Sequence, residues 1–193
     1  MPRPLVPNRR ERILDAAEEL VLADGFDSMS VAAIAANAGI GKGAVYREFA
    51  SKRDVLDALL QRGTARLSDR VRAETGERPP LSVAYRASAR ALLDDALMTA
   101  AFLDDRGILG SHVTDVDDGR YRARHLGVVE WVRDLHSRGE LDPRVDPESL
   151  ALALSSATIG LLSAARLLGP LSAEQLESAI DTVGLMAAGF ERN

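Results

Sequence analysis

The sequence predicts an all-α protein. Apolar residues recur at helical spacing along nearly the whole chain, and no stretch alternates with the two-residue period of a β-strand. Glycine and proline separate the helical stretches, as at Gly25, Gly39 and Gly169-Pro170, and these residues commonly end helices. Hydrophobic residues make up 46% of the 193 residues, and the chain has no cysteine. We therefore expect about nine helices around an apolar core that folds without disulfides.

Three short-range signals place the first helices. The first is expected over residues 8–25, the second is capped by Ser30 and extends to 39, and the third covers 42–49. The sequence Ser51-Lys-Arg-Asp54 then has the pattern of a capping box, in which each end bonds the backbone amide of the other. This box predicts a long fourth helix that ends near Ala73.

Later helices follow a clear break at residues 75–80, which read Thr-Gly-Glu-Arg-Pro-Pro. One long helix is expected over 81–103, and a short helix with a loop over 104–119. Two more helices are expected over 121–138 and 146–168. The pair Ser172 and Gln175 caps a last helix that continues toward the C-terminus.

Residues 30–49 have the side-chain sizes that a helix-turn-helix motif requires. Ala35 is small enough to admit the next helix at a steep angle, and Gly39 supplies the positive φ that the turn needs. Val45 anchors the third helix to the core. The outer face of that helix then offers residues that fit a DNA groove, which are Lys42, Gly43, Ala44, Tyr46 and Arg47.

The same region is similar to a known family over several stretches. These are residues 15–20, 24–26, 28–31, 34–35, 38–39, 42–49 and 51–52. They resemble the TetR family of repressors, with a specific match over about residues 8–60. Beyond residue 60 the match is only architectural. Further helices follow, and the last two, which are long and apolar, come after Arg138-Gly-Glu-Leu141. The resemblance implies a DNA-binding domain at 1–54, joined by the fourth helix to a ligand-binding and dimerisation domain at 55–193.

The resemblance also implies roles for individual residues. The segment 42–44 would face base edges, where Ala44 meets a thymine methyl group. Tyr46 and Lys52 would each bind a phosphate. Ser30 and the backbone amides at the start of the second helix would bind a further phosphate, and Arg47 would reach either a base edge or a phosphate. The predicted DNA-binding set is therefore Ser30, Lys42, Gly43, Ala44, Tyr46, Arg47 and Lys52.

Two positions depart from the family pattern. Gly41 replaces the serine or threonine that usually caps the third helix, at a cost of only a few tenths of a kcal/mol. Glu48 places a carboxylate near DNA, which is unfavourable unless it pairs with Arg47 or Arg53 or accepts from a cytosine. The net charge of the chain is −5. An alternative function is therefore a helical interaction module of the same fold with weak or lost DNA binding.

Six residues are candidates for a ligand pocket in the later helices. The competing interpretation for each is ordinary core packing, since aromatic residues make up only 4% of the chain. With few charges among them, the expected ligand is an apolar or mildly polar small molecule. The candidates are Tyr85, Met98, Phe102, Tyr121, His125 and Trp131.

A ridge of small residues predicts a homodimer. The helix over 146–168 carries Ala153, Ala157, Gly160 and Ala164 on one side, and such residues allow close approach of another helix. Together with the last helix they suggest a two-fold four-helix bundle, although an intramolecular core is the alternative. The residues expected in the interface from the last helix are Ile180, Val183 and Ala187.

Other functional classes find little support. No glycine-flanked serine suggests an enzyme, and no cofactor is expected. The histidines and aspartates His112, Asp115, Asp117, Asp118 and His125 are typical of a solvated turn, so no metal is expected. The uncharged segment 149–165 is too short for a membrane span, and the proline-rich N-terminus is no signal peptide. We expect a cytoplasmic repressor that binds a near-palindromic double-stranded operator and leaves it on binding a small molecule.

Overall fold

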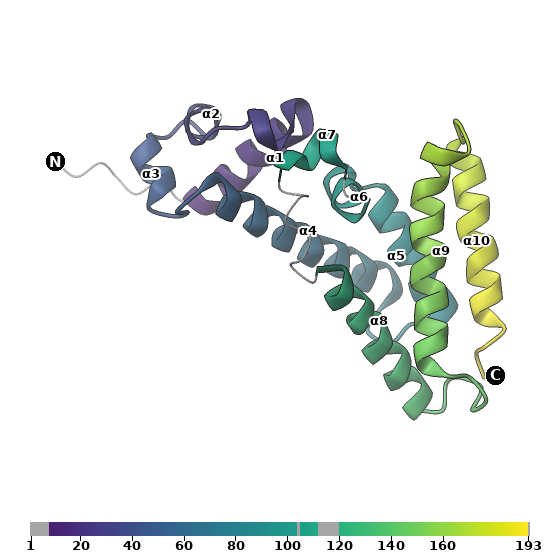
Figure 1. Cartoon of the computed structure of the whole chain (residues 1–193). Coiled ribbons are helices and arrows are strands. Elements are labelled where there is room, and N and C mark those ends of the chain that lie inside the picture. The colour runs from purple at the N-terminus through teal and green to yellow at the C-terminus, as the bar shows by residue number, and fades with distance from the viewer. Residues whose placement is uncertain (1–7, 104, 112–119, 193) are drawn as a thin grey trace. The chain divides into compact units, whose positions relative to one another are not determined.

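A computed structural model describes residues 8–103, 105–111 and 120–192, apart from the side chains of 120–124, 165 and 166. Ten helices form along this part of the chain (Figure 1). They are α1 (Arg9–Ser28), α2 (Val31–Asn37), α3 (Lys42–Tyr46), α4 (Lys52–Thr75), α5 (Leu81–Leu93), α6 (Ala96–Phe102), α7 (Arg106–Leu109), α8 (Arg120–Ser137), α9 (Pro147–Leu167) and α10 (Ala173–Ala188). The all-α prediction is confirmed, because the only β pairing within the described residues is a single bridge between Leu141 and Glu191.

The chain forms two compact units. The first contains residues 1–65 and 96–116, and the second contains 66–95 and 117–193. The helices α6 and α7 therefore pack with the N-terminal helices, although they come much later in the sequence. The functional division at residues 54 and 55 stays a prediction, since it describes roles and not packing.

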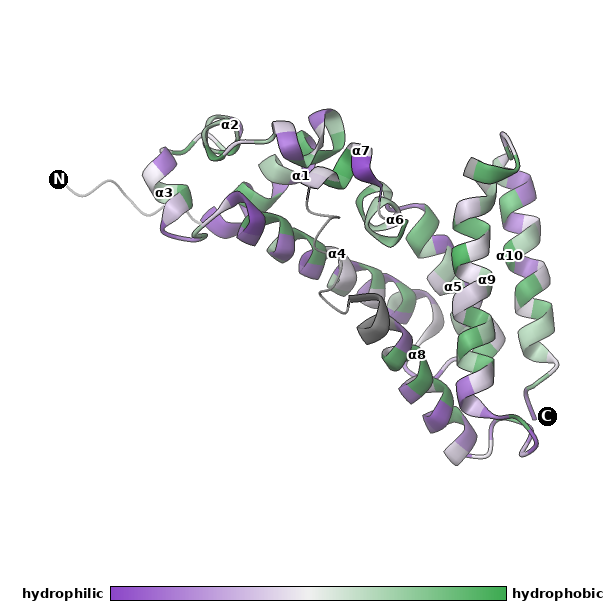
Figure 2. Ribbon diagram, in the orientation of Figure 1, coloured by the Kyte–Doolittle hydropathy of each residue, from purple (hydrophilic) through white to green (hydrophobic). Residues whose placement is uncertain are grey.

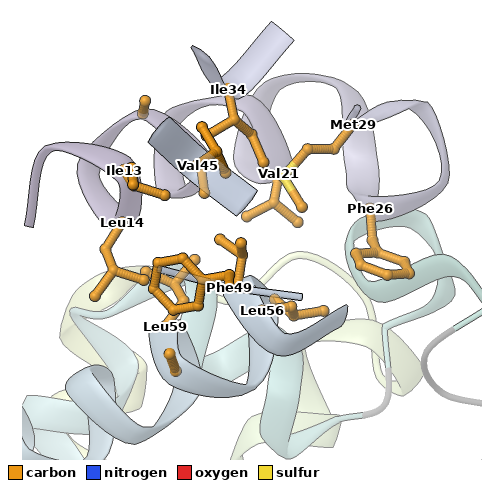
Figure 3. Close-up of a cluster of buried hydrophobic side chains, with 14 of the residues drawn as sticks. Ile13, Leu14, Val21, Phe26, Met29, Ile34, Val45, Phe49, Leu56 and Leu59 are labelled. Carbon is orange, nitrogen blue, oxygen red and sulfur yellow. The ribbon is translucent and has the colours of Figure 1, made fainter. Parts of the chain in front are cut away.

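The first unit is built around one apolar core (Figure 3). Three side chains predicted to hold the helix-turn-helix together, Ala35, Val45 and Phe49, are all buried in it. Side chains from α1 and α4 close the core around them, including Ile13, Leu14, Val21, Leu56 and Leu59. Leu97, Ala101 and Leu109 add α6 and α7 to the same cluster.

Local capping signals fold as the sequence predicts. The Ser30 hydroxyl accepts the Ala33 amide at 3.1 Å, and Gly39 has a φ of 64° at the turn. Ser51 and Asp54 form the expected reciprocal pair, with bonds of 3.0 and 3.1 Å between each amide and the opposite side chain. These caps fix where α2 and α4 begin, which sets the position of α3 between them.

The predicted single helix over 81–103 is wrong. The structure ends α5 at Leu93 and begins α6 at Ala96, and the two helices belong to different units. Asp94 and Asp95 lie at the break, where their carboxylates pair with Arg70 at 2.5 Å and Arg66 at 2.6 Å. Apolar periodicity continues through the break, so it hid an interruption that charge pairing with α4 favours.

The second unit packs α5, α8, α9 and α10 around its own core. Leu81, Tyr85, Val132, Leu150 and Ile180 are buried in it. The C-terminal residues seal one end, because the Glu191 carboxylate accepts the Ser82 amide at 2.6 Å in the first turn of α5. Within the described residues no helix combines the length and the apolar character that crossing a membrane requires.

Candidate nucleic-acid interface

The third helix presents the predicted DNA-reading residues on one exposed surface. Gly41 takes the N-cap position with extended backbone and makes no side-chain cap, as its missing side chain requires. Val45 points into the core, and this fixes the opposite face of α3 toward solvent. On that face Lys42, Gly43, Tyr46 and Arg47 are exposed, and Ala44 is half-buried. A Cβ added to Gly43 would meet no atom within 4 Å, so nothing in the chain obstructs close approach there.

Lys52 has a role within the chain that the sequence did not suggest. Its ammonium donates to the carbonyl oxygens of Phe26, Asp27 and Met29 at 3.0, 3.1 and 3.1 Å. It also lies 4.5 Å from the centroid of the Phe26 ring. An ammonium has three N–H donors, so these bonds use its full capacity. A direct phosphate contact would cost Lys52 at least one of them.

Three arginines in the first turns of α1 hold the ends of the helix-turn-helix. Arg12 donates to the Ala38 carbonyl at 2.6 Å, at the end of α2. Arg10 lies 4.5 Å from the centroid of the Phe49 ring, just after α3. Sequence reasoning missed both residues. The only signal was the basic start of α1, which gives no indication of partners so far along the chain.

The third of these arginines neutralises the unusual carboxylate. Arg9 Nη1 lies 3.6 Å from Glu48 Oε1, and the two side chains are 13% and 29% exposed. The sequence offered Arg47 and Arg53 as partners, and the structure pairs Glu48 with Arg9 instead. A partly buried pair brings less negative charge to an approaching phosphate than a lone carboxylate would.

We expect Arg9 and Glu48 to act as a coupled pair in DNA binding. Arg9→Gln exposes the carboxylate and should weaken duplex affinity, whereas Glu48→Gln removes the carboxylate, frees Arg9 and should tighten it. The double variant should recover most of the loss, with a coupling energy of about 0.5–1 kcal/mol. Fluorescence anisotropy with a labelled duplex measures the affinity of wild type, of both single variants and of the double variant. Strictly additive effects would show that the pair has no part in binding.

Further polar contacts tie α4 and α7 to α1 within the first unit. Arg62 of α4 bonds Glu11, Asp15 and Glu18 at 3.1, 2.7 and 2.7 Å. The Asp27 carboxylate accepts the amide and the hydroxyl of Ser111, and these bonds lower the pKa of Asp27 below its ordinary value. Helix α1, which packs against α2, is therefore held by segments that come later in the chain.

Comparison with known proteins agrees with this geometry. Residues 13–59 match the family model described as bacterial regulatory proteins, tetR family. The transcriptional regulator UidR of Escherichia coli K12 is 28% identical over 163 residues, which cover 80% of each chain. The structure of Salmonella enterica GusR aligns over 97% of this chain and 98% of its own, with 26% identity and a TM-score of 0.69. Residues 13–59 belong to the TetR family, and the whole chain resembles its members. The chain is a DNA-binding regulator of transcription.

A ligand-bound relative is also similar along its length. The SmeT–triclosan complex aligns over 96% of this TetR-family chain and 92% of SmeT, with 25% identity and a TM-score of 0.70.

The predicted pocket residues of this TetR-family regulator do not come from one unit. Met98 and Phe102 lie on α6 in the first unit, where Met98 is buried over Gly63. Tyr85 on α5, with His125 and Trp131 on α8, belongs to the second. The side chain of Tyr121 is outside the described part. So are the loop residues His112, Asp115, Asp117 and Asp118.

The predicted dimer residues divide into two groups. On α9, Ala153 and Gly160 are exposed, and Ala157 and Ala164 are half-buried. The prediction for α10 needs correction, because Ile180, Val183 and Ala187 pack in the core of their own chain, and Ile180 is 0% exposed. That face of α10 lies against α5, where a Cβ added to Gly184 would come within 2.7 Å of Arg86.

Other apolar residues occupy the exposed sides of the same two helices. Leu185 and Met186 on α10 are 68% and 66% exposed, a large fraction for apolar side chains. Figure 2 shows hydrophobic residues along both α9 and α10. The exposed apolar set is Leu152, Ile159 and Leu167 on α9, with Leu185, Met186 and the following Phe190 on the C-terminal side.

Proposed function

We propose that this TetR-family regulator is a cytoplasmic repressor that binds a near-palindromic operator as a homodimer and leaves it on binding a small molecule. The observation that carries the proposal is the exposed face of α3, which offers two cations and a tyrosine around a backbone open to close approach. SmeT, a relative of similar fold, has been solved with a small molecule bound, and this supports a ligand for this chain as well.

The operator contacts follow from that face. We propose that Lys42, Gly43 and Ala44 read base edges, and that Tyr46 holds a phosphate. Arg47 reaches either, and exposed Ser30 approaches a further phosphate beside α2. Lys52 contributes mainly by holding the end of α1, and its charge adds to the field that attracts DNA.

A second copy of the chain is the proposed partner of the exposed apolar sides of α9 and α10. The spacing of Leu152, Ile159 and Leu167 follows the helical repeat, so these residues form one stripe. Leu185 and Met186 extend it on the neighbouring helix. Two copies that meet here by two-fold symmetry would place their recognition helices about 34–36 Å apart, or a multiple of that, on DNA.

Release by a ligand would follow from linkage between the two units. The helix α4 contributes residues to both units, so a ligand that favours one position of α4 also favours one spacing of the DNA-reading helices. The expected coupling is about 1–3 kcal/mol, and DNA must weaken ligand binding by the same factor.

Operator binding separates this function from the alternative, an interaction module with lost DNA binding. We expect the full chain to bind a duplex from the DNA flanking its own gene at least about 10³-fold more tightly than a scrambled duplex of equal length. Anisotropy at two salt concentrations measures both affinities. Equal affinity for the two duplexes would favour the interaction module. The pairing of Glu48 with Arg9 removes the main argument for that alternative.

A further inference from the structure

One buried hydroxyl in the second unit has no hydrogen-bond partner at normal geometry, although the Thr158 hydroxyl lies near it. Tyr85 on α5 is 6% exposed, and its hydroxyl makes no hydrogen bond to any described residue. A buried polar group without a partner destabilises a fold, so each such group in a native structure requires an explanation. Burial raises the pKa of Tyr85, and the nearby Thr158 hydroxyl offsets this in part. At neutral pH Tyr85 is therefore a protonated donor.

Two hydroxyl groups on α9, those of Thr158 and Ser155, lie next in line after the Tyr85 hydroxyl. Thr158 donates its own hydrogen to the Leu154 carbonyl at 3.0 Å, so only its oxygen is available to a further group. Ser155 lies one turn earlier on α9, and its Oγ is 3.3 Å from Nδ1 of His125 on α8. Tyr85 on α5 thus neighbours Thr158 on α9, and Ser155 on α9 neighbours His125 on α8, so four polar side chains follow one another across three helices of one unit.

Apolar side chains of the same core lie on the helices α8 and α9 that carry three of these polar groups. Leu154 is buried, while Val128, Trp131 and Leu161 are only partly buried against the same core. Trp131 is the single tryptophan of the chain. An apolar surrounding with a few convergent polar groups is the usual composition of a small-molecule site.

We propose that Tyr85, Thr158, Ser155 and His125 form the polar end of a binding site for a neutral small molecule with an acceptor oxygen, such as a ketone or an ester. The Tyr85 hydroxyl donates to that oxygen, and the apolar side chains of α8 and α9 take the hydrocarbon part. A charged ligand fits poorly, because Tyr85, Thr158 and Ser155 carry no formal charge to repay its desolvation, and His125 Nδ1 already faces Ser155 Oγ at 3.3 Å. This inference rests on the proposed function, since it identifies the ligand class of the regulator.

The test compares the binding of two probes, cyclohexanone and methylenecyclohexane, to wild type and to Tyr85→Phe. The two probes have similar shapes, but only cyclohexanone has an acceptor oxygen. The ratio of ketone affinity to hydrocarbon affinity should be about tenfold higher in wild type than in Tyr85→Phe, because only the ketone accepts from Tyr85. Comparison of the two proteins cancels the different cost of removing each probe from water. Trp131 fluorescence and the ligand-induced rise in Tm report binding independently of DNA.

Two further variants separate a binding role from a structural one. Thr158→Val should weaken ketone binding, whereas Thr182→Val should not, because exposed Thr182 makes the same bond to the carbonyl four residues earlier, at 2.8 Å, but on α10. Without ligand, Tyr85→Phe should have an unchanged or higher Tm, since it removes an unpaired hydroxyl. A lower Tm would mean that the hydroxyl already has a partner such as an ordered water, and this would overturn the site.

The remaining outcomes also decide the question. An equal probe ratio in wild type and Tyr85→Phe, or binding of neither probe, overturns the proposed site. Anisotropy with the operator duplex, measured on the same samples, keeps this result apart from the proposed function. Operator binding with no ketone binding refutes the site alone. If the ketone binds and operator affinity does not change, the site is supported, but the proposal that a ligand bound at this site releases the operator is refuted.

Discussion

Gly160→Arg is expected to convert the proposed dimer into monomers and to lower operator affinity by about 10²–10⁴-fold, the range over which a second linked contact strengthens binding. Gly160 is exposed on α9, and an added Cβ would meet no atom within 4 Å, so the substitution fits a single chain. In the proposed interface the same arginine would put an unpaired charge between two apolar surfaces. Light scattering gives the mass in solution, and anisotropy gives the operator affinity.

A matched variant controls for charge and for loss of a helical glycine. Gly127 on α8 is exposed and also has open space around an added Cβ. Gly127→Arg should therefore remain a dimer with nearly normal operator affinity. A Gly160→Arg protein that is still a dimer would place the interface elsewhere on the chain.

Lys52→Met is expected to destabilise the first unit by about 2–4 kcal/mol and to abolish operator binding near the lowered Tm. Methionine keeps the length of the side chain and its contact with Phe26. It removes the three bonds to the end of α1, however, and leaves the carbonyls of Asp27 and Met29 without this donor. Denaturant unfolding gives the loss in stability. Below the transition, the slope of log affinity against log salt should stay close to that of wild type.

Lys42 is the natural control, because the chain has only these two lysines. Lys42 is exposed at the start of α3, so Lys42→Met should leave stability unchanged and reduce the salt slope by about one. The reverse pattern, a stable Lys52→Met protein whose salt slope has dropped by one, would show that Lys52 binds a phosphate.

The sequence by itself determined the local features of this protein. Ser30, Gly39 and the Ser51–Asp54 pair were predictable because a cap or a turn depends on residues within a few positions of one another. The burial of Ala35, Val45 and Phe49 followed from helical periodicity in the same way. Family resemblance then indicated the exposed face of α3 as the surface proposed to meet DNA.

Only the tertiary structure decided the contacts between residues far apart in the chain. Lys52 finds the end of α1 and Glu48 finds Arg9, and no local pattern distinguishes these partners from other nearby charges. The last helix shows the same limit, because α10 is apolar on more than one side. Periodicity identified Ile180 and Ala187 as a face to be buried, but α5 of the same chain covers that face and leaves Leu185 and Met186 exposed. The hydrophobic effect has no direction, so it requires burial without specifying which surface provides it.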